Sequence, residues 1–341
     1  MSAGIVVVTG GSAGVGRATV EAFAKAGWDV GIIARGQRRL DAAVAAVKRL
    51  GRRVCAVSAD VADADAVARA ADMIEQRLGP IDVWVNNAMV TVFGPVSALT
   101  ADEFKRGTDV TYLGQVHGTM AALKHMRPRN RGTIVNVGSA LSYRAIPLQS
   151  VYCAAKYAVR GFTDALRSEL LHDNVAVHLT MVHLAAMNTP QFDWALNKMS
   201  YRPQPVPPIF SPDVAARAIL FAATHRRREV WVGFPTVRTI LAGWFVPGFV
   251  DRYLSRAGYS GQLTSQPASS SAPGNLFEPV AGNWGAEGRF VKQERHTSLQ
   301  MLANRHRAST TGIVLALTGL AMWCGLRSRA PRQRTQPLLS R

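Results

Sequence analysis

Short runs of apolar, mostly β-branched residues recur along the first two thirds of the chain, and segments with helical periodicity lie between them. The runs are continuous rather than alternating, which is typical of strands buried on both faces of a parallel sheet. This strand–helix order predicts an α/β protein with a doubly wound parallel sheet in one domain over residues 1–235. The expected strands lie within residues 5–8, 29–35, 52–61, 81–90, 133–137, 175–184 and 228–233.

A glycine-rich turn separates the first strand from the first helix. Its spacing is TGxxxGxG, from Thr9 to Gly16. Glycines permit a tight turn and let the backbone approach a pyrophosphate, which then lies at the amino terminus of the following helix. Strand, glycine turn, helix and second strand together predict the dinucleotide-binding loop of a Rossmann fold. The residues of this turn expected to bind a cofactor are Thr9, Gly10, Ser12, Gly14, Val15 and Gly16.

The second strand ends at Arg35, nineteen residues after Gly16. An acidic residue at this place binds the ribose 2′-hydroxyl of NAD, whereas an arginine suits the 2′-phosphate of NADP. Arg17 adds positive charge in the turn, and we interpret Arg38 and Arg39 as part of a solvated helix face. The sequence therefore favours NADP(H) over NAD(H), with Arg35 as a cofactor-binding residue.

A serine and a Tyr-x-x-x-Lys pair follow the strand at residues 133–137. Tyr152 and Lys156 lie four residues apart in an Ala-rich segment, so on a helix they project from one face. Tyrosine ionises near pH 10 in isolation, and a nearby ammonium lowers that value. Tyr152 could then exchange a proton with a carbonyl or alcohol, while the Ser139 hydroxyl hydrogen-bonds the same oxygen.

These residues, in this order along the chain, resemble the short-chain dehydrogenase/reductase family, from about Val6 to Gly233. The resemblance implies reversible hydride transfer between a nicotinamide cofactor and a carbonyl or secondary alcohol. It implies that Ser139, Tyr152 and Lys156 are catalytic, and that the Tyr–Lys pair also contacts the cofactor.

The resemblance extends to further cofactor residues. Asp60 and Val61 are expected against the adenine, Asn87 and Ala88 of an NNA motif on the nicotinamide side, and Thr189 at the carboxamide. The chain departs from the family at Ala185 or Ala186, where a proline is common, and at two further positions. Met89 replaces the glycine that usually follows the motif, and Thr111 replaces an asparagine that helps hold a water in the proton path. We retain Thr111 as a candidate catalytic residue.

Residues 187–210 are rich in aromatic residues and proline. Family members place the substrate lid here, and the apolar content favours a lipophilic substrate, although the same residues could pack against the domain. Residues 236–260 read as an apolar helical extension broken at Pro247. It could complete the core, pack on a partner subunit or lie in a membrane interface.

The net charge is +18, from 40 Lys and Arg against 22 Asp and Glu. Residues 261–341 hold 10 basic and 3 acidic residues, so the excess is spread over the chain and no nucleic-acid module accompanies it. We expect no nucleic-acid partner. Three distant cysteines and the lone His117 and His125 predict no metal site. A homo-oligomer is left open.

The last eighty residues change in composition. Residues 261–307 are predicted as a flexible linker because Ser, Gly, Pro and Ala dominate without periodicity. Residues 308–326 contain no charge and, at 1.5 Å per residue, would span ~28 Å as a helix. They predict a transmembrane anchor with a basic tail at 327–341; a buried helix is the alternative. Both flanks are basic, so the positive-inside rule leaves the orientation open. We expect the catalytic domain in the cytoplasm.

The sequence thus predicts an NADP(H)-dependent oxidoreductase that acts on a lipophilic carbonyl or alcohol. A membrane-associated scaffold that binds the cofactor without turnover is the alternative hypothesis.

Overall fold

A computed structural model describes residues 2–269, 272 and 274–305 of the chain. Its central sheet has seven strands, all in parallel register, in the order β11-β7-β6-β4-β1-β2-β3. The predicted doubly wound parallel sheet is therefore confirmed. The strands are β1 (Ile5–Thr9), β2 (Asp29–Ala34), β3 (Val54–Ser58), β4 (Val83–Asn86), β6 (Thr133–Ser139), β7 (His178–Leu184) and β11 (Glu229–Trp231).

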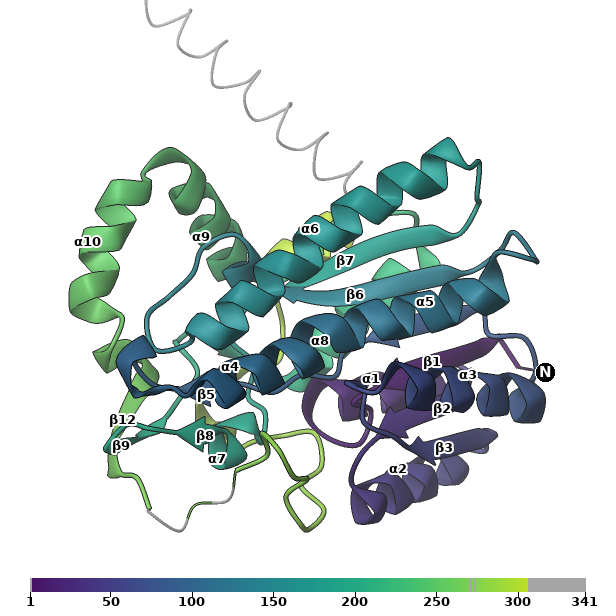
Figure 1. Ribbon diagram of the computed structural model, residues 1–341, viewed down its shortest axis with the longest axis horizontal. Helices are drawn as coiled ribbons and strands as arrows, with labels where there is room; N and C mark the ends of the chain where they lie inside the picture. The colour runs from purple at the N-terminus through teal and green to yellow at the C-terminus, as the bar shows by residue number, and fades with distance from the viewer. Residues whose placement is uncertain (1, 270–271, 273, 306–341) are drawn as a thin grey trace, which may run out of the picture. The chain divides into compact units, whose positions relative to one another are not determined.

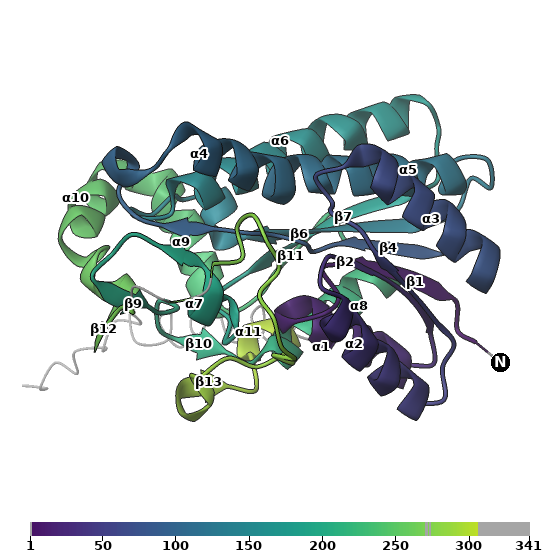
Figure 2. The same cartoon turned by 60° about the horizontal axis from the view of Figure 1, so that its bottom comes forward.

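Helices cover both faces of the sheet (Figures 1 and 2). The sheet edge formed by the carboxyl ends of the strands carries the longer loops. One face packs against α1 (Gly14–Lys25), α2 (Gln37–Arg49) and α8 (Pro212–Thr224). The other packs against α3 (Ala64–Leu78), α5 (Gly114–Met126) and α6 (Ser150–His172), and α4 (Ala101–Thr108) packs against α6 on the same side.

Burial on both faces explains why the strand runs are continuously apolar. Every residue of β1 and β2 is buried. The connection order reverses between β1 and β4, because β2 and β3 lie on one side of β1 while β4, β6 and β7 lie on the other. Open α/β sheets bind their ligands outside the carboxyl ends of the strands at this reversal, and Thr9 and Asn86 end the two strands concerned.

The part of the chain predicted as a linker differs from that prediction. Within residues 261–299 the chain forms β12 (Leu263–Pro267), which pairs with β9 (Tyr201–Pro203), and β13 (Glu294–Arg295), which pairs with β10 (Ile209–Phe210). Leu276 and Phe290 are buried. A few isolated apolar side chains and main-chain pairing therefore fix a stretch whose composition alone favours flexibility.

Two helices follow the last strand of the main sheet, namely α9 (Phe234–Phe245) and α10 (Pro247–Ala257). Proline opens α10, so the break predicted at Pro247 is confirmed. In Figure 1 both helices project to the left of the sheet. They do not complete the core, because most of their apolar side chains are exposed.

Residues 300–341 are assigned to a second unit, of which residues 300–305 are described; they belong to α11 (Leu299–Arg305). No helix in the described part of the chain is long and apolar enough to cross a membrane. The predicted transmembrane segment at 308–326 and the basic tail at 327–341 lie outside the described residues.

Candidate active site

The glycine turn leaves no room for side chains. Gly10 has a φ of +66°, in the left-handed region that glycine adopts without strain. A Cβ on Gly16 would lie 2.2 Å from the carbonyl oxygen of Gly10. The turn leads into α1, and its backbone can therefore approach an anion at the amino terminus of that helix, as a dinucleotide requires.

The turn is tied to the end of β4 by hydrogen bonds. The Thr9 hydroxyl accepts from the N–H groups of Asn87, at 3.0 Å, and Ala88, at 3.2 Å. The Asn87 amide donates back to the carbonyl of Thr9 at 3.1 Å. Asn86 instead points into the core, where its amide donates to Thr119 and Asn136. The NNA motif therefore has two structural tasks: Asn86 supports the sheet, and Asn87 and Ala88 fix the glycine turn.

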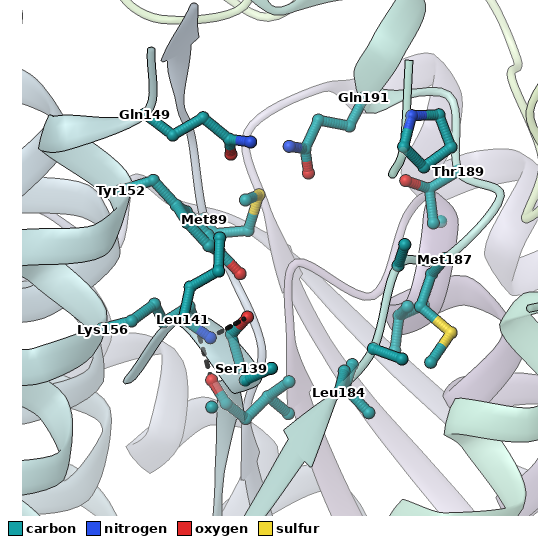
Figure 3. Close-up of a pocket in the computed structure, with 18 of the residues that line it drawn as sticks. Met89, Ser139, Leu141, Gln149, Tyr152, Lys156, Leu184, Met187, Thr189 and Gln191 are labelled. Carbon is teal, nitrogen blue, oxygen red and sulfur yellow. Dashed lines mark hydrogen bonds between the residues drawn. The ribbon is translucent and has the colours of Figure 1, made fainter. Parts of the chain in front are cut away.

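Ser139, Tyr152 and Lys156 come together at the carboxyl end of β6. Ser139 ends the strand, and the other two residues lie one turn apart on α6. The Lys156 ammonium nitrogen lies 5.6 Å from the centroid of the Tyr152 ring and donates to the carbonyl oxygen of Val137 at 2.6 Å. Figure 3 shows Tyr152, Lys156 and Ser139 on one side of a pocket, with Thr189 and Met187 on the other.

Burial dominates the protonation of the Tyr–Lys pair. It raises the pKa of Tyr152 well above its usual value, and a hydrogen bond with Ser139 acts in the opposite direction. It also lowers the pKa of Lys156 to about 7. The sequence suggested that a charged Lys156 lowers the pKa of Tyr152. The structure differs because both groups are removed from water, which favours the neutral form of each.

Thr111 does not line the cavity, but its neighbour Val110 and its hydrogen-bond partner Val90 do. It lies in a π-helical turn, Asp109–Leu113, and is fully buried. Its hydroxyl donates to the carbonyl of Val90 at 2.8 Å and accepts from the Val90 N–H at 3.0 Å. The hydroxyl therefore joins two segments of backbone, and its role in the proton path stays a prediction.

One cavity of about 790 Å³ connects the glycine turn with the Tyr–Lys pair. Of the residues predicted as catalytic or cofactor-binding, Thr9, Gly16 and Thr111 lie outside its lining. The predicted residues that line it are Gly10, Ser12, Gly14, Val15, Arg35, Asp60, Val61, Asn87, Ala88, Ser139, Tyr152, Lys156 and Thr189.

Arg35 has partners that the sequence did not suggest. Its guanidinium donates to the main-chain carbonyls of Asn275 and Phe277, both at 2.6 Å. It lies 3.9 Å from the Asp60 carboxylate, which also accepts from Arg106. Two of the five guanidinium N–H groups therefore bind the segment that the sequence assigned to a linker.

We call residues 274–290 the cover segment, because they contact Arg35 and contribute Asn275 to the lining of the cavity. Leu276 is 1% exposed and belongs to the same hydrophobic cluster as Val61 and Val110. The N–H of Gly14 donates to the carbonyl of Gly285 at 3.0 Å. The segment is further fixed by Arg289, which donates to the Phe192 carbonyl at 2.9 Å.

Two further cavity residues were missed or misinterpreted. Arg39 is buried rather than solvated, and its guanidinium lies 5.0 Å from the Trp194 ring. Arg17 points away from the cavity and pairs with Glu21 at 2.7 Å. Gln149 lines the cavity beside Tyr152, and its amide donates to Gln262 from the far part of the chain at 2.7 Å. Only the tertiary structure reveals such long-range partners.

A buried polar cluster lies behind Ser139. His183 is fully buried, and its Nδ1 lies 3.1 Å from the Ser139 carbonyl oxygen. Glu229 accepts from the Tyr143 hydroxyl and lies 3.5 Å from His183. Burial alone would raise the pKa of Glu229, but the hydrogen bonds with His183 and Tyr143 outweigh it and hold the pKa far below its usual range.

In the described part of the chain, no group of His, Cys, Asp and Glu side chains could hold a metal ion. His117 lies 2.9 Å from the Val61 carbonyl through its ring Nδ1, and His125 lies beside Asp72.

Comparison with known proteins yields consistent matches. The family model for short chain dehydrogenases matches residues 4–197. The uncharacterized oxidoreductase YxnA of Bacillus subtilis is 32% identical over 280 residues, which is 82% of this chain and 79% of that protein.

Two solved structures are also similar. A short-chain dehydrogenase from Streptomyces avermitilis has a TM-score of 0.63 at 27% identity and covers 76% of this chain and 97% of its own. An alcohol dehydrogenase from the archaeon Thermococcus sibiricus, in complex with 5-hydroxy-NADP, has a TM-score of 0.58 at 25% identity. It covers 67% of this chain and 95% of its own.

Proposed function

The chain belongs to the short-chain dehydrogenase family and is an oxidoreductase that acts on CH–OH groups; on that premise we propose that it uses NADP(H) and Ser139, Tyr152 and Lys156 to interconvert a lipophilic carbonyl compound and its alcohol. The single observation that carries this proposal is the common cavity. It joins a glycine turn suited to a pyrophosphate with a tyrosine, a lysine and a serine suited to proton transfer.

The chain's own residues supply the proton and the polarisation. In the reductive direction Tyr152 gives its phenolic proton to the substrate oxygen, and the Ser139 hydroxyl donates a hydrogen bond to the same oxygen. The bound nicotinamide supplies or accepts the hydride at the adjacent carbon. In the oxidative direction Tyr152 takes the proton back.

Lys156 has two expected roles. Its pKa of about 7 places its protonation change within the neutral range, so it can return a proton toward Tyr152 between turnovers. Its ammonium also lies within the cavity lining, where a nicotinamide ribose hydroxyl could accept a hydrogen bond from it. The Val137 carbonyl holds the amine in place for both roles.

The cavity residues fit a dinucleotide with a 2′-phosphate. The glycine turn offers N–H groups other than that of Gly14, which binds Gly285, to the pyrophosphate. Arg35 keeps three N–H groups beyond the two that bind the cover segment. Arg39 adds a second guanidinium on the cavity wall. The 5-hydroxy-NADP in the Thermococcus sibiricus enzyme gives a precedent for a related cofactor in this fold.

The substrate part of the cavity is mostly apolar, which supports a lipophilic substrate. It is lined by loops after β6 and β7 and by the α9–α10 pair. The apolar residues in this part are Leu141, Leu184, Met187, Val206, Val246, Phe249 and Val250.

We also propose that residues 308–326 anchor the protein to a membrane with the catalytic domain in the cytoplasm. The support is the length of this uncharged stretch and the arginines on both sides of it. Membrane fractions washed with carbonate should retain the full chain and release a chain that lacks residues 308–341.

The decisive experiment compares the wild type with Tyr152→Phe. NADPH and NADH binding are titrated by fluorescence, and turnover is screened with ketones and secondary alcohols of increasing chain length. We expect the wild type to prefer NADPH, and Tyr152→Phe to bind the cofactor normally while losing about 10²–10⁴ in kcat.

Three outcomes are informative. Normal turnover by Tyr152→Phe would disprove the assigned proton donor. Cofactor binding by the wild type without turnover of any compound would favour the scaffold hypothesis. A folded protein that binds neither nucleotide would overturn both.

A further inference from the structure

Helices α9 and α10 form a hairpin with an unusually apolar exposed surface. We call residues 234–257 the hairpin. Phe245 is 77% exposed and Phe249 is 68% exposed, although both are large aromatic residues. Large exposed apolar patches mark interaction sites rather than ordinary protein surface. The exposed apolar side chains of the hairpin are Phe234, Leu241, Trp244, Phe245, Val246, Phe249 and Tyr253.

The hairpin is held firmly against the catalytic part of the molecule. The Trp244 ring packs 5.7 Å from Tyr143 and 6.1 Å from Trp231. Arg144, which follows Tyr143, forms an ion pair with Asp251. The exposed aromatic residues are therefore presented by a fixed element, because one side of the hairpin is packed while the other faces solvent.

The charges of the hairpin favour an anionic partner. Arg238, Arg252 and Arg256 are exposed, and Asp251 is the only acidic residue within 234–257. Since Asp251 pairs with Arg144, the three arginines carry the electrostatic character of this surface. Aromatic residues interleaved with arginines are typical of helices that lie in a membrane interface, where anionic headgroups attract the cations.

The hairpin also forms the wall of the cavity at the end opposite Arg35. Ala242, Val246, Phe249, Val250 and Tyr253 line it. Some of these side chains, Phe249 and Tyr253 among them, are both lining and exposed. The apolar surface outside and the apolar cavity inside are therefore continuous.

We propose that the hairpin docks on the surface of an anionic lipid bilayer, and that a lipophilic substrate passes from the bilayer into the cavity between the hairpin residues. The passage of substrate from the bilayer into the cavity rests on the proposed function, whereas the docking of the hairpin does not. A second copy of the chain is a less favourable occupant. A two-fold interface would bring the arginines of both hairpins to one surface, where like charges repel. The uncharged stretch at 308–326 of the same chain is consistent with a bilayer nearby.

The test places a polarity-sensitive dye on the hairpin of the full chain. Cys324 is replaced by Ser, because Cys55 and Cys153 are buried, and a single cysteine is introduced by Phe245→Cys. The matched control is Leu171→Cys, since Leu171 is 73% exposed near the end of α6, away from the hairpin. Each protein is mixed with vesicles of phosphatidylcholine, with or without about one third phosphatidylglycerol.

We expect a blue shift of the dye at position 245 with anionic vesicles and a clearly smaller shift with neutral vesicles or at position 171. Arg252→Glu combined with Arg256→Glu should weaken the response at 245 at least about tenfold in lipid concentration, because each basic residue contributes about 1 kcal/mol near an anionic surface. High salt should act in the same direction.

Two results would overturn the proposal. A blue shift at 245 that grows with protein concentration without vesicles would show that a second copy covers the hairpin. Co-sedimentation with vesicles without any shift at 245 would show that another part of the chain binds them.

Turnover of a short, water-soluble ketone is measured on the same samples. Loss of docking with intact turnover refutes only the docking, and absent turnover with intact docking refutes only the proposed function.

Discussion

The two ends of the cavity are built in opposite ways. At the Arg35 end, Asn275 of the cover segment lines the cavity, and carbonyl groups of the segment accept hydrogen bonds from Arg35 and from the Gly14 N–H. At the hairpin end, apolar side chains line the cavity and many of them remain exposed. The first end is closed by directional polar contacts, while the second is open and apolar.

This difference assigns different tasks to the two ends. Hydrogen bonds with fixed donors discriminate strongly between ligands, because an unpaired buried donor or acceptor costs free energy. An apolar opening discriminates weakly and allows exchange of lipophilic molecules. We expect the cofactor to be selected and retained at the Arg35 end, and the substrate and product to exchange at the hairpin end.

The largest expected effect comes from opening the Arg35 end. Leu276→Ser removes the buried side chain that fixes the cover segment, and loss of such burial costs about 2–5 kcal/mol. We expect NADPH to dissociate at least about tenfold faster, because 1.4 kcal/mol corresponds to a factor of ten. Stopped-flow displacement of bound NADPH by excess NADP⁺ measures this rate.

Leu171→Ser serves as the control, because that leucine is largely exposed and lies far along α6. If Leu276→Ser lowers the melting temperature but leaves the NADPH dissociation rate unchanged, the cover segment stabilises the fold without retaining the cofactor.

A smaller effect is expected from Arg35→Asp. The change removes a cation from the expected 2′-phosphate site and adds an acceptor for a ribose hydroxyl. Charge-assisted hydrogen bonds contribute about 1.5–3 kcal/mol, so the ratio of the NADH and NADPH dissociation constants should shift by roughly 10–100-fold toward NADH. Titration of both nucleotides gives this ratio.

Arg38→Asp is the matched control, since Arg38 is exposed and undergoes the same change of charge. Equal weakening of both nucleotides by Arg35→Asp would mean that Arg35 acts by holding the cover segment, and that another group determines the cofactor preference.

The contrast between the two ends also shows what the sequence could reveal. The buried strands, the glycine turn and the Tyr–Lys pair depend on local patterns, and the structure places them as those patterns predict. The cover segment is held by main-chain carbonyls and by Leu276. Every residue has a main-chain carbonyl, so hydrogen bonds to carbonyls leave no signal in the sequence. A single leucine in a Ser/Gly/Pro-rich stretch is only a weak signal of burial.

The hairpin illustrates a second limit. Its apolar composition is the same whether it completes a core, meets a partner or faces a membrane, and only the surrounding structure shows that Phe245 and Phe249 are exposed. The protonation of the Tyr–Lys pair is a third case, because spacing indicates proximity but does not reveal the burial that lowers the pKa of Lys156.

That buried amine, between the two ends, predicts a pH-dependent stability. Burial lowers the pKa of Lys156 from 10.5 to about 7. Between these values the unfolded chain holds a proton that the folded chain lacks, so this group makes folding more favourable as the pH rises. The free-energy cost of burying the charged Lys156 side chain is fully present below about pH 7 and is absent above about pH 10.5.

Lys156→Met removes this cost together with the hydrogen bond to Val137. Relative to the wild type, we expect the stability of the variant to fall by about 3 kcal/mol between about pH 6 and pH 9, because the difference develops over the two pH units from about 7 to 9 and each unit corresponds to 1.36 kcal/mol. Urea unfolding at both pH values measures the difference. A difference that does not change with pH would mean that Lys156 is charged in the folded protein throughout this range.

The smallest effect on turnover is expected at Thr111, which joins the π-helical turn to Val90 outside the cavity lining. Thr111→Val keeps the shape of the side chain and removes the hydroxyl, which leaves the Val90 N–H and carbonyl without this partner. We expect a loss of about 1–2 kcal/mol in the free energy of unfolding and less than about a threefold change in kcat. Thr111→Ser, which keeps the hydroxyl, should restore most of the stability. A kcat that falls a hundredfold in Thr111→Val and recovers in Thr111→Ser would instead place this hydroxyl in the proton path that serves the Tyr–Lys pair.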